Sequence, residues 1–306
     1  MGTVRIPVAS SRLVLAGVLM LSGCTVTTAP VASITAFPAS TPEAPVAAPS
    51  PAATPTMQPT PTPRAQPPPV ATEPAGIAAQ IVTAERAVRD PSVTGAELAW
   101  MAHLQQRAYR SIAARPEWHD SVLAAVPPDL RGAATANLDA TMDLRATVVP
   151  GPDLPAAWRI VDPAPMGDLA RYYRDAEAEF GVPWSYLAAI HLVETRMGRI
   201  RGTSVAGAQG PMQFMPGTWA AYGDGDVNSD RDSIRAAARY LRANGAPANM
   251  PNALFRYNNS QRYVRAVTAY AEVMRLEPDA YRGYYGWQVY YLTTKGDILL
   301  PVGYGR

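Results

Sequence analysis

The sequence predicts a mainly α-helical protein with a small C-terminal β-hairpin, preceded by a helical region and a disordered proline-rich linker. Apolar residues recur at helical spacing through most of the chain from about residue 76 onward. The stretch 284–301 is instead rich in aromatic and β-branched residues, which are typical of strands. The 31 prolines among 306 residues are unevenly spread and are dense before residue 76, where they disfavour regular structure.

Length, charge and cysteine content narrow the possible classes of protein. A chain of 306 residues can form one sizeable domain with appendages. Its 27 basic and 25 acidic residues nearly balance, and a net charge of +2 does not indicate nucleic-acid binding. The single cysteine excludes an intrachain disulfide.

Residues 1–23 have the pattern of a signal peptide. Basic residues precede the apolar run "LVLAGVLML", which is much shorter than the roughly 20 residues that a helix needs to span a bilayer. The run leads into "LSGC", which resembles the lipobox of bacterial lipoproteins. The resemblance implies that Cys24 carries lipid, palmitate included, and anchors the protein to a membrane on the extracytoplasmic side of the cell envelope. The alternative is a plain secretory signal with an incidental cysteine.

Residues 24–75 consist mostly of Pro, Ala, Thr and Ser and carry few charges. Such a segment buries too little apolar surface to offset its ordering entropy, so we expect disorder with local polyproline II. At about 3.1 Å per residue, some 50 residues reach on the order of 150 Å. This length suits a tether, although a linker without any length requirement explains the composition equally well.

Residues 76–147 form a predicted helical region, rich in Ala, Leu, Arg and Glu. Nothing with metal-ligand spacing accompanies His103 or His119, and we interpret the region as a packing or spacing module without chemistry. We predict its helices at about 77–89, 94–114, 116–125 and 128–146.

A shorter linker, 148–165, leads to the main domain, 166–306. Trp158 and Ile160 are expected to order this linker against a neighbour. The tail contains "KGD" between two strand-like runs, which predicts a hairpin over 284–301. We predict the helices of the domain at about 167–180, 184–197, 216–222, 232–244, 250–257 and 261–275.

One acid lies at an unusual place in the second of these helices. Glu194 continues the apolar face of Leu187 in the last turn, just before Gly198. Apolar surroundings and the negative end of the helix dipole both raise the pKa of a carboxyl group. A carboxylic acid that stays protonated near neutral pH can protonate a glycosidic oxygen. The alternative is an exposed helix-end glutamate paired with Arg196 or Arg199.

Two downstream stretches supply polar groups among apolar ones. "TSVAGAQGPMQFMPGTW" contains Gln213, whose amide both donates and accepts hydrogen bonds, and glycines that permit close backbone approach. "FRYNNSQRYV" adds Tyr257 and Asn258 near another helix end. An acid, an amide, a tyrosine and several aromatic residues suit a groove for a neutral polymer with N-acetyl groups, although Gln213 alone also fits a solvated turn.

The stretches "ETRMG", "SVAGAQGPMQFMPGTW" and "RYNNSQRYV" resemble three motifs of lytic transglycosylases with a lysozyme-like fold, in the same order. The resemblance covers about residues 168–274. It implies that Glu194 is the catalytic acid and base. It also implies that the groove residues are Ser204, Gln213, Met215, Tyr257 and Asn258.

The resemblance further implies cleavage of peptidoglycan glycan strands between N-acetylmuramic acid and N-acetylglucosamine, with a 1,6-anhydro product and a single carboxyl group. A muramidase that admits water is a close alternative, and a non-catalytic cell-wall-binding scaffold is a more distant one. We expect a monomer that needs no cofactor and binds no nucleic acid. The aromatic residues of the tail either line a glycan path or pack the hairpin.

Some positions depart from the family pattern or leave a choice open. Thr195 replaces a common Ser, Pro211 replaces a Leu, and Arg256 and Ser260 differ beside Tyr257, which bears on the subsite around that tyrosine. The calcium candidates Asp224, Asp226 and Asn228 have the alternate spacing of a calcium loop but lack its later Gly and Glu. We favour a polar turn capped by Asp232 over a calcium site there.

Overall fold

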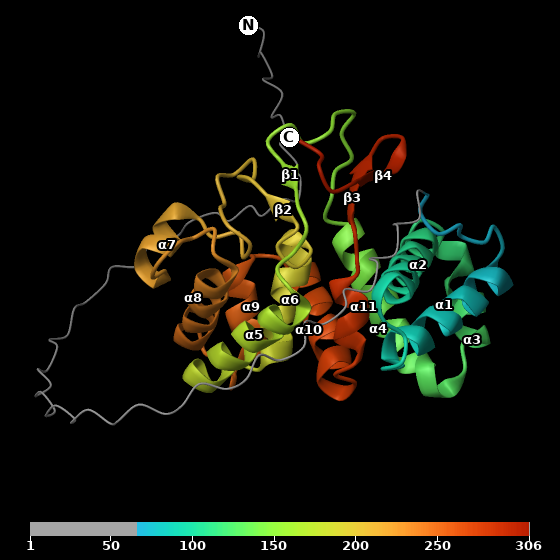
Figure 1. The fold of residues 1–306 in the computed structure, drawn as a ribbon, viewed down its shortest axis with the longest axis horizontal. Helices are drawn as coiled ribbons and strands as arrows, with labels where there is room; N and C mark the ends of the chain where they lie inside the picture. Colours follow the sequence, from blue (N-terminus) through green and yellow to red (C-terminus); the bar gives the residue numbers. More distant parts are fainter. Residues whose placement is uncertain (1–65, 306) are drawn as a thin grey trace, which may run out of the picture.

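The computed structural model describes residues 66–305 (Figure 1). The predicted signal peptide, Cys24 and most of the predicted tether lie outside the described residues. The described chain is mainly helical with a C-terminal antiparallel hairpin, as the sequence predicts.

Two helices of the helical region, Pro74–Arg89 and Pro128–Arg145, begin with a proline. Proline is tolerated there because the backbone N–H groups of the first turn have no partner within the helix. Its helices end within a few residues of the predicted positions. They are α1 (Pro74–Arg89), α2 (Gly95–Ala113), the 3-10 turn η1 (Pro116–Trp118), α3 (His119–Ala125) and α4 (Pro128–Arg145).

The remaining helices follow the predicted order, with one addition before the hairpin. Three of them begin at side-chain caps: Ser229, Asn249 and Ser260 each accept a hydrogen bond from a backbone N–H of the first turn. The helices are α5 (Met166–Phe180), α6 (Trp184–Thr195), α7 (Pro216–Tyr222), α8 (Asp230–Ala243), α9 (Met250–Tyr257), α10 (Gln261–Leu276) and α11 (Ala280–Tyr285).

Two small antiparallel sheets complete the fold. The linker 148–165 contains β1 (Arg159–Ile160), which pairs with β2 (Ile200–Arg201) directly after α6. The predicted tail forms β3 (Val289–Thr293) and β4 (Gly296–Leu300). The hairpin is shorter than predicted, because Tyr284 and Tyr285 belong to α11; the Tyr284 side chain is buried and its hydroxyl donates to Asn137 Oδ1 of α4 (2.5 Å).

One hydrophobic core joins the helical region to the rest of the protein. Helix α10 packs against α4 on one side and α6 on the other. The core includes Tyr109 and Leu138 of the helical region together with Leu187 and Tyr263. Figure 1 shows α6 and α10 in the middle, with α1–α3 on one side and α7 and α8 on the other. The helical region is therefore part of the same packed unit as Glu194.

The end of the predicted tether packs on this region. Ala71 N donates to Gln80 Oε1 (2.9 Å), whose own Nε2 donates to Pro69 O (2.9 Å). Val70 and Ala71 lie against the core. For residues 66–73 the structure therefore differs from the predicted disorder, because their backbone finds partners on α1.

The hairpin is fixed to the helical region by polar contacts. Asp297 of β4 accepts from Arg110 of α2 (2.6 Å) and from Arg145 of α4 (2.9 Å). His103 lies within hydrogen-bond distance of the Tyr290 hydroxyl (2.8 Å), and it is half-buried at this boundary. No helix in the described residues is both long and apolar enough to cross a membrane.

Candidate active site

Helix α6, which carries Glu194, lies in the middle of the molecule (Figure 1). Its residues are apolar on nearly every side, and Leu187 and Ile190 are fully buried, which is the pattern of a helix surrounded by others. The helix ends one residue after Glu194, where Arg196 adopts the left-handed conformation (φ 55°). Glu194 therefore lies in the last turn, as predicted.

The Glu194 carboxyl group has one hydrogen-bond partner among the described residues, the hydroxyl of Tyr263, which donates to Oε1 (2.7 Å). Burial raises the pKa of Glu194 to about 7, although the bond from Tyr263 acts in the opposite direction. Neither Arg196 nor Arg199 pairs with it: Arg196 donates to Leu192 O (2.6 Å) and Arg199 to Tyr285 O (3.1 Å). The alternative of an ion-paired, exposed glutamate is therefore wrong.

The turn after α6 is held in an unusual backbone shape. Arg196, Met197 and Gly198 all have positive φ, at 55°, 59° and 80°. A Cβ atom at Gly198 would lie 2.5 Å from Asp230 Oδ1, so both the conformation and the space require glycine. Thr195 Oγ1 donates to Pro211 O (2.5 Å) and accepts from Gly198 N (3.1 Å), which ties the helix end to the next loop.

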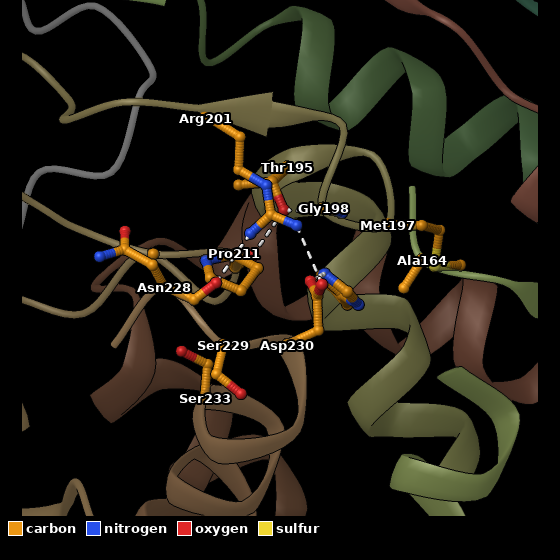
Figure 2. Close-up of polar contacts among 12 residues, drawn as sticks. Ala164, Thr195, Met197, Gly198, Arg201, Pro211, Asn228, Ser229, Asp230 and Ser233 are labelled. Carbon is orange, nitrogen blue, oxygen red and sulfur yellow. Dashed lines mark hydrogen bonds and ion pairs between the residues drawn. The ribbon is translucent and has the colours of Figure 1, made fainter. Parts of the chain in front are cut away.

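Next to this turn, several polar side chains that are largely buried connect α6 to α8 (Figure 2). His191 Nδ1 is 2.7 Å from the Tyr173 hydroxyl, and its Nε2 is 3.4 Å from Asp230 Oδ1. Arg201 of β2 donates to Asp230 Oδ2 (2.9 Å) and to Asn228 O (3.0 Å). Burial lowers the pKa of His191, so the imidazole is neutral near pH 7. These contacts hold the C-terminal end of α6 in place.

The loop between β2 and α7 brings Gln213 to Glu194. A Cβ atom at Gly210 would lie 1.9 Å from Val227 O, so only glycine fits there. Gln213 has a positive φ of 52°, and its Nε2 donates to Gly210 O (2.9 Å). Ser204 has a different place: its Oγ accepts from Ala208 N (3.0 Å) and shapes the loop.

Two cavities adjoin at Gln213. The first lies beside Glu194 and is also lined by Asn258. The second is lined by Met215 and Tyr257, whose hydroxyl donates to Met212 O (2.7 Å). The structure thus brings Glu194, Gln213 and Asn258 together and places Met215 and Tyr257 next door. Ser204 is not among the described residues that line either cavity.

Several lining residues were not singled out from the sequence. Tyr263 lies inside the motif-like stretch "RYNNSQRYV", three residues after Ser260, which caps α10. Its place in the first turn of a helix that faces α6 could have indicated that its side chain reaches Glu194. The helical region, interpreted as lacking chemistry, supplies part of the wall. Lining residues from the helical region and hairpin include Gln106, Arg110, Thr141, Leu144, Arg145, Trp287, Val289, Tyr290, Tyr291 and Leu292.

The calcium candidates form a hydrogen-bonded turn. Asp226 Oδ1 accepts from Asn228 N (2.9 Å), and Asp224 pairs with Arg235 (3.1 Å). Asp232 accepts from Asp226 N (3.1 Å). Within residues 66–305, no group of three or more His, Cys, Asp or Glu side chains is placed to hold a metal ion.

Comparison with known proteins bears on the part of the chain that holds these residues. Residues 171–274 match the family model described as the transglycosylase SLT domain. The chain carries an SLT domain. The match includes Glu194, Gln213 and Tyr263, and it confirms the resemblance to lytic transglycosylases.

A curated relative agrees with the SLT domain. Over 127 residues the chain is 28% identical to the membrane-bound lytic murein transglycosylase F of Thiobacillus denitrificans. The alignment covers 39% of this chain and 27% of the relative, so the chain spans about a quarter of that protein's length. No solved structure gives a significant match. The helical region, β1 and the C-terminal hairpin lie outside the SLT match.

Proposed function

We propose that the protein is a lytic transglycosylase that cleaves the β-1,4 bond between N-acetylmuramic acid and N-acetylglucosamine in peptidoglycan. The observation that carries this proposal is a glutamate with a raised pKa, Glu194, within the residues that match the SLT domain. Its carboxyl group has a pKa of about 7, accepts a hydrogen bond from Tyr263 and lines a cavity. Such a group is protonated in a large fraction of molecules at neutral pH and can act first as an acid and then as a base.

The first half of the reaction is a proton transfer. Glu194 donates its proton to the bridging oxygen while the bond from that oxygen to C1 of the muramyl residue breaks. N-acetylglucosamine leaves with a free 4-hydroxyl group. The N-acetyl group of the muramyl residue stabilises the positive charge that develops at C1, so a second carboxylate is not needed.

The second half returns the proton. The Glu194 carboxylate accepts the proton of the muramyl 6-hydroxyl while the oxygen of that group bonds to C1, which closes the 1,6-anhydro ring. The Tyr263 hydroxyl stabilises the carboxylate between the two halves, since a hydrogen bond to the charged form favours it. The side-chain amides of Gln213 and Asn258 supply donors and acceptors for substrate N-acetyl groups.

The products decide between this reaction and its alternatives. The full-length protein is incubated with purified peptidoglycan, and the soluble fragments are analysed by mass spectrometry. We expect muropeptides lighter by one water than hydrolytic products. Reducing ends would show a muramidase with the same acid. Binding without release of any fragment would show a cell-wall-binding scaffold. A Glu194→Gln variant serves as the control for contaminating activity.

We also propose that the protein acts as a monomer, without a cofactor, and is anchored in the cell envelope through lipid on Cys24. Incorporation of labelled palmitate into the parent but not into a Cys24→Ala variant tests the anchor. Unchanged activity after treatment with a metal chelator tests the absence of a calcium requirement. A sedimentation coefficient typical of one chain tests the monomer.

A further inference from the structure

The cavity beside Glu194 carries an excess of positive charge. Three arginines line it: Arg110 of α2, Arg145 of α4 and Arg196 after α6. Glu194 is the one acid among the described lining residues. Asp297, which does not line this cavity, pairs with both Arg110 and Arg145, so one carboxylate is shared by two guanidinium groups. A substrate in this cavity therefore meets a cationic wall.

Arg196 is the least compensated of the three. Among the described residues no carboxylate forms an ion pair with Arg196, and its guanidinium donates a hydrogen bond to Leu192 O. Its guanidinium lies near Tyr270 and Arg110, both of which line the cavity. Burial lowers the pKa of Arg196 to about 10, which still leaves it charged at neutral pH. A half-buried cation without a counter-charge is costly unless a ligand supplies one.

The backbone at Arg196 adds to this cost. Arg196 and Met197 are consecutive non-glycine residues with positive φ, a conformation that amino acids other than glycine rarely adopt. The hydrogen bond to Leu192 O caps the end of α6, and it uses one of the five guanidinium N–H groups. Lysine could cap the helix in the same way. The remaining N–H groups of the planar guanidinium are suited to a carboxylate, which they bind in a fork.

We propose that Arg196, supported by Arg110 and Arg145, binds a carboxylate carried by the substituent of the substrate's muramyl residue. This proposal rests on the proposed function. The carboxylate has two possible sources. One is the lactyl group itself, left free where an amidase reaction has removed the stem peptide. The other is the stem peptide attached to that group. Arg196 thereby selects which glycan strands bind, while Glu194 cleaves them.

The first test measures how tightly the protein binds glycan strands with and without carboxylates. Glycan strands are prepared with peptides removed, with peptides intact, and in both forms after the carboxylates are converted to neutral amides. Binding to the full-length Glu194→Gln protein, in which strands are not consumed, is measured by calorimetry. If Arg196 binds the lactyl carboxylate, amidation should weaken the binding of peptide-free strands roughly tenfold; if it binds the stem peptide, amidation should weaken the binding of peptide-bearing strands to the same extent. A tenfold change is the effect expected from the loss of one charge-assisted hydrogen bond.

The variants then assign the effect to Arg196. Arg196→Gln, made in the Glu194→Gln background, should lose the preference for charged strands, whereas Arg196→Lys should keep part of it. Arg174→Gln is the matched control, because it removes the same charge from an exposed side chain of α5. In the active parent, Arg196→Gln should raise KM about tenfold with little change in kcat.

Each outcome supports or overturns the proposal. A preference confined to peptide-free strands assigns the lactyl carboxylate, and one confined to peptide-bearing strands assigns the stem peptide. Equal binding of charged and amidated strands in both pairs overturns the proposal without any variant, even if Arg196→Gln fails to fold. A protein that binds charged strands selectively but never cleaves them would instead contradict the proposed function alone.

Discussion

Two carboxyl groups, Glu85 of the helical region and Glu194 of the SLT domain, have very different surroundings. Glu85 of α1 is fully buried and contacts Arg89, Tyr109 and Asn137. Glu194 has only the Tyr263 hydroxyl as a hydrogen-bond partner among the described residues, and burial raises its pKa to about 7. Glu85 is surrounded by a guanidinium group and two further donors, whereas burial with a single hydrogen-bond partner raises the pKa of Glu194, so that a large fraction of its molecules hold a proton at neutral pH.

The same contrast applies to the two regions as wholes. The stretches that resemble family motifs all lie within the residues matched to the SLT domain. The helical region has no comparable motif, and yet Arg110 and Arg145 line the same cavity as Glu194. The residues that line a cavity are constrained by shape and charge, and many different sequences can meet those constraints. The contribution of the helical region to the cavity is therefore visible in the structure and not in the sequence.

The largest effect should come from removing the acid itself. Glu194→Gln retains the size of the side chain and an oxygen for Tyr263, but it cannot transfer a proton. We expect a fall of about a thousandfold in kcat, within the range for loss of general acid–base catalysis. The rate of anhydro-muropeptide release measures it. If the variant cleaved as fast as the parent, the comparison between the two carboxyl groups would have no basis.

Glu85→Gln is the matched change in the helical region. It leaves the half-buried Arg89 with Glu277 as its one ionic partner among the described residues, so we expect the free energy of unfolding to fall by about 3 kcal/mol. Urea denaturation measures the loss. The kcat per folded molecule should stay near that of the parent, because Glu85 does not line the cavity. A large loss of kcat in fully folded protein would contradict a structural role.

Glu194→Gln should also stabilise the protein at alkaline pH. The folded pKa of about 7 lies above the ordinary glutamate value of 4.5, so the stability associated with the protonated group is complete below pH 4.5 and is lost as pH rises through 7. At pH 8 the variant should therefore exceed the parent by about 3 kcal/mol in the free energy of unfolding. At pH 4.5 the difference should nearly vanish. Denaturation curves at the two pH values measure it, and a gain that is equal at both would contradict the raised pKa.

Tyr263→Phe should have a smaller effect on rate with a distinct signature. The hydroxyl lowers the pKa of Glu194, so its removal should move the alkaline limb of the pH–rate profile upward. We expect kcat near pH 7 to fall about tenfold, since the carboxylate loses its hydrogen bond between the two halves of the reaction. Tyr186→Phe, which removes a hydroxyl bonded to Glu272, is the control. A lower rate with an unmoved alkaline limb would indicate a packing defect instead.

The sequence was sufficient where local spacing decides the structure. Apolar residues at helical spacing predict most helices to within a few residues, because helix formation depends on neighbours in the chain. The aromatic tail was less decisive: Tyr284 and Tyr285 form the end of a helix, because the buried hydroxyl of Tyr284 finds Asn137 on α4. Propensity alone cannot weigh such a distant contact.

The sequence by itself determined that an acid ends an apolar helix, that its pKa is raised, and that a family motif surrounds it. Only the tertiary structure decided which side chains lie around that acid and line its cavity. Tyr263 lies 69 positions from Glu194, and Arg110 and Arg145 precede it in a region without motifs. Their meeting depends on α10 packing between α4 and α6, and such packing is set by many weak contacts along whole helix faces. No short stretch of sequence encodes those contacts, and so the raised pKa of Glu194 was predictable while the residues that surround it were not.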